Sequence, residues 1–187
     1  MEKKSNRGDE QKMKAIESCK GESEFNWINM FFEMCEVISK KSKDPSTKVG
    51  CVITGENNSV ISAGFNGFPI GVEDSLLDLS NNIKKSKRYE RPEKYYWTAH
   101  AEENAIAFAA RNGVSTRGAT LYVNRMMPCT RCTRLIIQSG IKKIVVLIDV
   151  PDETSKRWKE DNCIAEQMLK EAGVQMLVFK KTCKIKK

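Results

Sequence analysis

Histidine is almost absent from this sequence, because His100 is the only one among 187 residues. A site in which one chain supplies two histidine ligands is therefore excluded. The sequence also lacks any apolar run that approaches the roughly 20 residues of a membrane-spanning helix, and no signal-peptide pattern opens it. We expect a soluble, cytoplasmic protein that makes no contact with membranes.

Disulfide signals are missing as well. The chain has seven cysteines, an odd number, and only Cys129 and Cys132 are closely spaced. A secreted disulfide framework normally shows an even number of cysteines in a regular pattern. Reduced cysteines, two of which hold a metal, fit this composition better. The remaining five are Cys19, Cys35, Cys51, Cys163 and Cys183.

Negative charge is in deficit, with a formal net charge of +8 and a pI of about 9.1. Such a balance favours an anionic partner, either nucleic acid or a nucleotide phosphate. Much of the excess lies at the end of the chain, where a lysine-rich terminus is more often a solvated tail than a binding arm. The lysines concerned are Lys180, Lys181, Lys184, Lys186 and Lys187.

The length suits one domain with flanking segments. Residues 1–22 mix both charges with few large apolar side chains, and we expect a disordered arm there. Residues 23–180 are expected to form the folded domain, and residues 181–187 form the basic tail.

Helical and strand patterns alternate along the domain. A hairpin followed by alternating helices and strands predicts an α/β domain in which helices cover a mixed sheet. Helices are expected over 26–41, 99–112, 129–139 and 155–172, and strands over 49–54, 60–66, 120–124, 143–148 and 174–179.

Residues 67–97 interrupt the alternation, and a long excursion within a compact domain is usually functional or mobile. Its end carries the run Tyr95-Tyr96-Trp97. These rings could stack on a base, but we favour burial in the core as the simpler interpretation.

The chemistry-bearing residues form two clusters, His100-Ala101-Glu102 and Pro128-Cys129-Thr130-Arg131-Cys132. His-x-Glu followed by Pro-Cys-x-x-Cys is the signature of zinc-dependent nucleobase deaminases. Two cysteines three apart at a helix start can face one ion. One histidine completes three protein ligands and leaves the fourth position of tetrahedral zinc open for water, as in catalytic sites. Both clusters precede expected helices, whose N-termini favour thiolates over thiols.

Glu102 is too close to His100 in the chain to be a convenient fourth ligand. It is suited to carry a proton from the attacking water to the ring N3, and later to the departing amine. The alternative is a structural zinc, but such sites are usually closed by a fourth Cys or His, and the sequence offers no second cysteine pair. Arg131 could bond a cysteine sulfur, although an orientation toward solvent is the simpler interpretation.

Several further segments resemble the deoxycytidylate (dCMP) deaminases of bacteria, large phages and eukaryotes. They span roughly residues 26–180. The zinc motif marks the wider zinc-dependent cytidine and deoxycytidylate deaminase superfamily, and the narrower markers are Lys48-Val49-Gly50 and Gly64-Phe65-Asn66-Gly67. The matching segments are 44–50, 64–69, 100–106, 108–113, 118–123 and 129–143.

The resemblance implies a cytidine-deaminase-like fold, a three-layer α-β-α arrangement with a central mixed five-stranded sheet. It implies hydrolytic deamination of dCMP to dUMP with release of ammonia, for the supply of pyrimidine deoxynucleotides. It also implies a homo-oligomer, often a hexamer, activated by dCTP and inhibited by dTTP. By the same match, His100, Cys129 and Cys132 bind zinc, and Glu102 is the proton donor and acceptor.

Two further residues are carried over from the resemblance. Asn66 matches the asparagine that contacts the nucleotide sugar, although a turn residue after a strand is the alternative. Arg111 matches an arginine linked to oligomer or effector behaviour. It lies about 16 Å along the helix from His100, too far to hold the substrate phosphate directly.

The chain also departs from the family. The segment 124–127, which leads into the zinc cysteines, looks one residue longer and more basic than usual, so we expect it to shape the base pocket. Lys48 and Arg125 are candidates for contact with the substrate phosphate, as is a residue from 67–97. Phage members can hold a second zinc with an extra histidine, which this chain lacks, so we expect one zinc per chain.

Two other functions stay open. The first is the same chemistry on dCTP, on deoxycytidine or on a base in nucleic acid. The basic charge keeps nucleic acid as a partner, though a less expected one than a free nucleotide. The second is a non-catalytic zinc module, and the presence of Glu102 argues against it.

Overall fold

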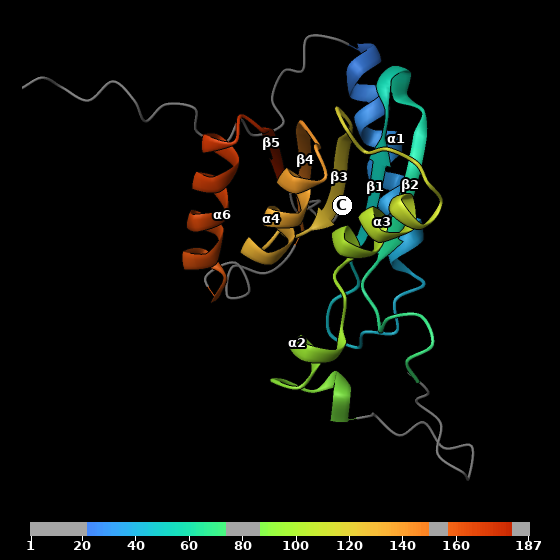
Figure 1. The fold of residues 1–187 in the computed structure, drawn as a ribbon, viewed down its shortest axis with the longest axis vertical. Coiled ribbons are helices and arrows are strands. Elements are labelled where there is room, and N and C mark those ends of the chain that lie inside the picture. Colours follow the sequence, from blue (N-terminus) through green and yellow to red (C-terminus); the bar gives the residue numbers. More distant parts are fainter. Residues whose placement is uncertain (1–21, 74–86, 150–156, 181–187) are drawn as a thin grey trace, which may run out of the picture.

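The computed structural model describes residues 22–73, 87–149 and 157–180 (Figure 1). Five strands form one sheet in the order β2-β1-β3-β4-β5. Strand β1 lies between β2 and β3 and is antiparallel to both, whereas β3, β4 and β5 run parallel to one another. The sheet is therefore mixed, as the sequence predicts. The strands are β1 (Gly50–Thr54), β2 (Val60–Phe65), β3 (Thr120–Arg125), β4 (Lys143–Ile148) and β5 (Gln175–Lys180).

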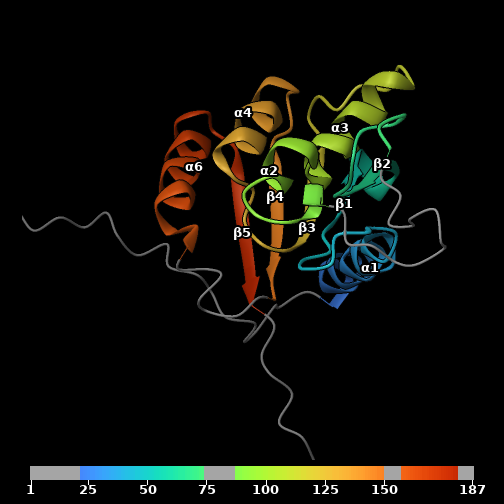
Figure 2. The same cartoon turned by 90° about the horizontal axis from the view of Figure 1, so that it is seen from below.

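Helices cover both faces of the sheet, which confirms the three-layer arrangement. Figure 2 shows α1 (Glu22–Ser39) on one face and α3 (Ala101–Arg111), α4 (Thr130–Gln138) and α6 (Lys159–Glu171) on the other. The short α2 (Lys94–Trp97) lies at one end of the sheet rather than on either face (Figure 1). Two single 3₁₀ turns occupy Glu56–Asn58 and Lys87–Tyr89.

Alternation along the strands builds a separate core on each face, because successive side chains of a strand point to opposite sides. Leu121 and Val123 of β3 belong to the core beneath α3, α4 and α6. Tyr122, between them, packs against Phe31 of α1 with the ring centroids 4.7 Å apart. The sheet is thus held from both sides by buried apolar side chains.

Gly64 brings β2 into direct contact with the backbone of α3. A Cβ atom at this position would lie 2.4 Å from both the carbonyl oxygen of Ala101 and the nitrogen of Ala105. Real Cβ atoms do not approach backbone so closely, so only glycine allows the strand and the helix to pack at this spacing. The first turn of α3 is therefore placed directly against the sheet.

The element boundaries agree with the sequence predictions to within a few residues. The largest differences are α1, which begins four residues earlier than predicted, and the start of α6. Gly113, Gly140 and Gly173 follow helices with φ of 67°, 78° and 67°, as expected of helix-ending glycines. Residues 1–21 of the predicted arm, the basic tail and residues 74–86 of the excursion lie outside the described residues, and Glu22 begins α1. Within the described ranges, no helix is both long enough and apolar enough to cross a membrane.

Candidate active site

Three potential metal ligands meet where two neighbouring helices begin. His100 is the N-cap of α3 and Cys129 is the N-cap of α4, with Cys132 in the first turn of α4. Nδ1 of His100 lies 3.4 Å from Sγ of Cys129 and 3.3 Å from Sγ of Cys132. The three ligand atoms all lie within 4.8 Å of one another. The fold thus brings His100 next to two cysteines that lie 29 and 32 positions further along the chain.

The donor set fits zinc. With Zn–N and Zn–S bonds of about 2.1 and 2.3 Å, a tetrahedral ion places nitrogen and sulfur ligands roughly 3.6 Å apart. The observed separations of 3.3 and 3.4 Å are close to this edge. Cys132 is fully buried behind the site, whereas His100 and Cys129 line an open pocket. Three protein ligands, two of which line an open pocket, are the arrangement expected of a catalytic rather than a structural site.

The two thiols are electrostatically unequal. A hydrogen bond from Cys132 lowers the pKa of Cys129 to about 4, against the opposing effect of burial, and His100 lowers it further. The same contact and burial raise the pKa of Cys132 well above its ordinary value. The contacts thus favour the thiolate at Cys129, and a metal ion that binds both sulfurs requires Cys132 to lose its proton as well.

Glu102 is the buried acid of the site. It lines the pocket with only 5% of its surface exposed. Burial raises its pKa from 4.5 to about 7, while His100 opposes the rise and Cys129 adds to it. A carboxyl group with a pKa near neutrality can both accept and release a proton, as general acid–base catalysis requires.

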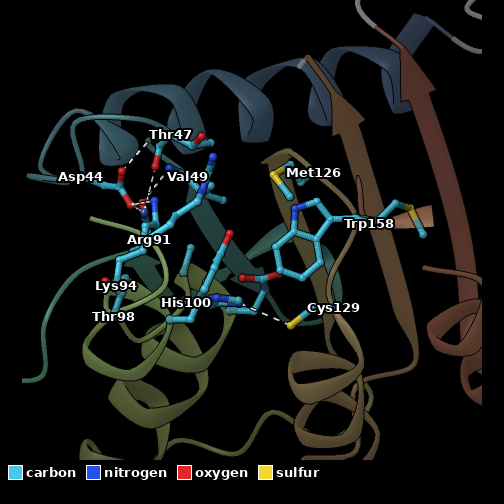
Figure 3. Close-up of a pocket in the computed structure, with 15 residues that line it drawn as sticks. Asp44, Thr47, Val49, Arg91, Lys94, Thr98, His100, Met126, Cys129 and Trp158 are labelled. Carbon is cyan, nitrogen blue, oxygen red and sulfur yellow. Dashed lines mark hydrogen bonds and ion pairs between the residues drawn. The ribbon is translucent and has the colours of Figure 1, made fainter. Parts of the chain in front are cut away.

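The pocket extends away from the metal ligands between three segments (Figure 3). The loop before β1 contributes Asp44, Thr47 and Val49, and the segment ahead of α3 contributes residues from Arg91 to Ala101. Met126, Met127 and Trp158 close the other side. Segments far apart in the chain therefore share one cavity with Glu102 and His100.

Asn66 lines this pocket, but its amide also organises the loop before β1. Its Oδ1 accepts a hydrogen bond of 2.8 Å from the backbone nitrogen of Val49, and its Nδ2 donates to the carbonyl oxygen of Thr47 at 2.9 Å. A longer contact of 3.4 Å reaches Oδ2 of Asp44. The predicted contact with a nucleotide sugar stays a prediction, and a role in fixing the loop accompanies it.

The structure does not bring the other predicted substrate residues to the pocket. Lys48 is exposed, and neither Lys48 nor Arg125 lines the cavity. Arg125 instead pairs with Glu36 of α1 at 2.7 Å and with Asp149 at 2.6 Å. Arg111 is exposed at the far end of α3 from His100, in agreement with the prediction that it does not hold the substrate phosphate.

The segment 124–127 shapes the pocket through its backbone. Arg125 has φ of 76°, a left-handed conformation uncommon for a residue with a side chain. Its ion pairs hold the turn at the end of β3, and Met126 and Met127 then line the pocket. The expectation that this segment contributes to the pocket agrees with the structure, although through methionines rather than through Arg125.

The sequence did not single out four residues of the pocket wall, namely Asp44, Arg91, Lys94 and Trp158. Arg91 and Lys94 do lie in the segment 67–97, from which a phosphate contact is one of the expectations. For the aromatic run, the preference for core burial was wrong. Tyr95 lines the pocket, Tyr96 is 82% exposed, and Trp97 is half-buried. The short helix α2, which carries these rings, lies at one end of the sheet rather than against either face. It therefore cannot bury all three rings in the core.

Comparisons with known proteins point in one direction. A sequence profile for the cytidine and deoxycytidylate deaminase zinc-binding region matches residues 25–148. An Aliivibrio fischeri protein described as an uncharacterized deaminase in the luxG 3' region is 41% identical over 150 residues, which is 80% of this chain and 91% of the relative. Mouse deoxycytidylate deaminase is 32% identical over 163 residues, 87% of this chain and 85% of its own.

A solved structure shares the fold. The dCMP deaminase of cyanophage S-TIM5, in complex with dCMP and dUMP, has a TM-score of 0.56 and 22% identity. The match covers 86% of this chain and 99% of the cyanophage chain. At this identity the similarity confirms the predicted architecture of the sheet and its covering helices.

Proposed function

Because the chain belongs to the zinc-binding cytidine and deoxycytidylate deaminase family, we propose that it deaminates dCMP hydrolytically to dUMP and ammonia. One observation carries the proposal most directly. The buried acid Glu102 and the ligand pair His100 and Cys129 line the same pocket. A non-catalytic zinc module would have no need of a buried acid with a pKa near neutrality beside the metal ligands.

His100, Cys129 and Cys132 would hold the zinc ion, which when bound supplies a Lewis acid that activates water for attack on the ring C4. Glu102 accepts the proton of the attacking water at its carboxylate. It delivers this proton to N3 of the cytosine ring as the attack proceeds. It then takes the proton of the new C4 hydroxyl and passes it to the amino group, so that the C4–N bond breaks, ammonia departs and the C4 carbonyl of the uracil ring forms.

The pocket offers apolar surfaces for a flat ring. Tyr95 and Trp158 meet edge to face with their ring centroids 6.1 Å apart, and both line the cavity together with Met126. Figure 3 shows Trp158 and Met126 on the side of the pocket that also holds Cys129. We propose that these side chains exclude water around the base and hold it against the metal site.

We further propose that Arg91 contacts the substrate phosphate. Arg91 lines the pocket, is exposed, and joins no ion pair among the described residues. Lys94 is less available, because its Nζ already donates to Asp44 and Ser46 at 2.7 Å each. In Figure 3, Arg91 and Lys94 lie across the pocket from Cys129, where the phosphate of a nucleotide bound by its base would extend.

Assembly and regulation are proposed on the strength of family resemblance. We propose a homo-oligomer whose activity responds to dCTP and dTTP, with Arg111 at the end of α3 as a candidate contact. Light scattering coupled to gel filtration, with and without each nucleotide, tests this. A monomer unchanged by either nucleotide would refute it.

The experiment that tests the substrate is a direct comparison. Purified zinc-loaded protein is given dCMP, dCTP, deoxycytidine, CMP or a cytosine-containing oligonucleotide, and product formation is followed by absorbance or ammonia release. We expect the highest kcat/KM with dCMP. Preference for dCTP would retain the chemistry and change the substrate, and faster deamination of an oligonucleotide would make nucleic acid the partner. No deamination of any cytosine compound would reject the proposal.

A further inference from the structure

One carboxylate oxygen touches both segments that supply the metal ligands. Oε2 of Glu103 accepts a hydrogen bond of 2.7 Å from the backbone nitrogen of His100. The same oxygen accepts one of 2.5 Å from Nη2 of Arg131, which lies between the two ligand cysteines. A single side chain of α3 therefore links the start of its own helix to the start of α4.

Arg131 strengthens this link through a second contact. Its Nη2 also lies 3.4 Å from the carbonyl oxygen of Thr98, two residues before the ligand histidine. Within the described residues, the hydrogen bonds of Arg131 reach the segment 98–103 and no cysteine sulfur. The guanidinium thus joins the two ligand segments to each other, in place of the sulfur contact or the free orientation that sequence alone allows.

The start of α4 is also held from its other side. The backbone nitrogen of Thr130 donates to Asp161 of α6 at 2.9 Å, and its hydroxyl donates to the same carboxylate at 2.8 Å. Residues 130 and 131 are therefore bound to two different helices. The first turn of α4, which carries Cys132, is fixed between α3 and α6.

The exposure of the pair decides what it can contribute. The side chain of Arg131 is 46% exposed and that of Glu103 is 20% exposed. An ion pair with this much contact with solvent adds little to the stability of the folded chain. Its consequence therefore lies in where it holds the ligand atoms rather than in the stability of the whole domain.

We propose that Glu103 and Arg131 are positioning residues that hold His100, Cys129 and Cys132 at ligand distance before zinc binds. The inference rests on the metal-binding part of the proposed function and is independent of which cytosine compound is the substrate. Partners that orient metal ligands typically change metal affinity about 10- to 100-fold when they are removed.

The test measures zinc affinity by competition with a chromophoric chelator. Glu103→Gln retains an acceptor for the His100 nitrogen but removes the charge, and Arg131→Gln removes the guanidinium. Arg134→Gln is the matched control, because it removes the same charge from an exposed position one turn further along α4. We expect Arg131→Gln to weaken zinc binding at least about tenfold, with Arg134→Gln unchanged.

Two further measurements separate positioning from general stability. The variant with both Glu103→Gln and Arg131→Gln should bind zinc no more weakly than the weaker-binding single variant. Either substitution already removes the interaction between the two residues, so their effects on affinity do not add. The thermal midpoints of the metal-free proteins should all agree within about 2 °C, as expected for an exposed ion pair.

Three results would overturn the proposal: affinities equal to that of the Arg134→Gln control, single effects that simply add, or a fall in metal-free stability that matches the loss of affinity. The cobalt(II)-loaded proteins give an independent signature, since displaced thiolates alter the charge-transfer absorption. A wild-type protein that binds zinc tightly and fails to deaminate dCMP would refute the proposed substrate while leaving this inference intact.

Discussion

The ammonium group of Lys94 lies 2.7 Å from Oδ2 of Asp44, although 50 residues separate the two in the chain. The side chains are only 10% and 2% exposed. This buried pair fastens the segment ahead of α3 to the loop before β1, and these segments form two walls of the pocket. Together with the hydrogen bond of 2.7 Å from Lys94 to Ser46, this contact ties two walls of the pocket to each other.

Lys94→Met should destabilise the protein. The substitution leaves the carboxylate of Asp44 buried without its cation, and breaking a buried pair costs about 3–5 kcal/mol. The remaining hydrogen bonds to Asp44 from Ser46 and Thr47 place the expected loss near the lower end of that range. Urea unfolding measures it, and Lys87→Met, at an exposed position, serves as the control. Equal stability of the two variants would contradict the importance of the pair.

The contribution of Asp44 to stability should depend on pH. Burial alone would raise its pKa, but hydrogen bonds from Lys94, Ser46 and Thr47 outweigh burial and lower the pKa below 3.8. A carboxyl group with a lowered folded-state pKa stabilises the protein above its unfolded pKa and loses that effect as the pH falls through the folded value. The difference in unfolding free energy between wild type and Asp44→Asn should be full at about pH 6 and shrink below about pH 4. A difference that grows on acidification would be the wrong sign.

Glu102→Gln should retain zinc and lose nearly all deaminase activity. The amide keeps the shape of the side chain but cannot carry the proton, an effect of about 10²–10⁴-fold or more on kcat. Steady-state kinetics and metal analysis on the same preparation measure both quantities. Glu90→Gln, at an exposed position in the segment ahead of α3, controls for the change of charge. Near wild-type turnover in Glu102→Gln would remove Glu102 from the mechanism.

The protein should bind one zinc ion per chain. Among the described residues, His100, Cys129 and Cys132 form the one group of three or more potential ligands that lie close together. Cys132→Ala should abolish tight binding, whereas Cys163→Ala, which alters an exposed cysteine of α6, should not. Elemental analysis of protein purified without added metal gives the stoichiometry. Two tightly held ions per chain would show that a second site exists.

Arg91→Gln should raise the KM for dCMP and leave that for deoxycytidine unchanged. A charge-assisted hydrogen bond contributes about 1.5–3 kcal/mol, which corresponds to roughly 10- to 100-fold in specificity. Arg125→Gln is the informative comparison, because Arg125 is engaged by Glu36 and Asp149. It should lower stability more than it changes the preference for the nucleotide. The reverse outcome would assign phosphate recognition to Arg125, as the sequence alone allows.

The metal ligands and Glu102 could be predicted from sequence because each cluster lies within a short segment. The spacing in His100-Ala101-Glu102 and in the Cys129–Cys132 run specifies the local geometry. The helices that follow were predicted from periodicity, and the glycines after them predicted where they end. The contact between the two clusters then required only that α3 and α4 lie side by side on one face of the sheet, as the fold provides.

The far wall of the pocket could not be predicted in the same way. The pairing of Lys94 with Asp44 and the meeting of Tyr95 with Trp158 join residues that no local pattern connects. The same limit applies to Arg125, whose basic charge favours a phosphate contact in the sequence. In the structure its charge is neutralised by carboxylates from α1 and from the end of β4.

The glycine at position 64 has a consequence for how this scaffold can diverge. Because β2 meets the backbone of α3 without an intervening side chain, the sheet itself sets the position of the histidine and glutamate at the start of that helix. The walls that face a substrate belong to other segments, the loop before β1, the segment ahead of α3 and Trp158. Reaction chemistry and substrate choice are therefore physically separable, so the loops can evolve new specificities while the deaminating machinery stays in place.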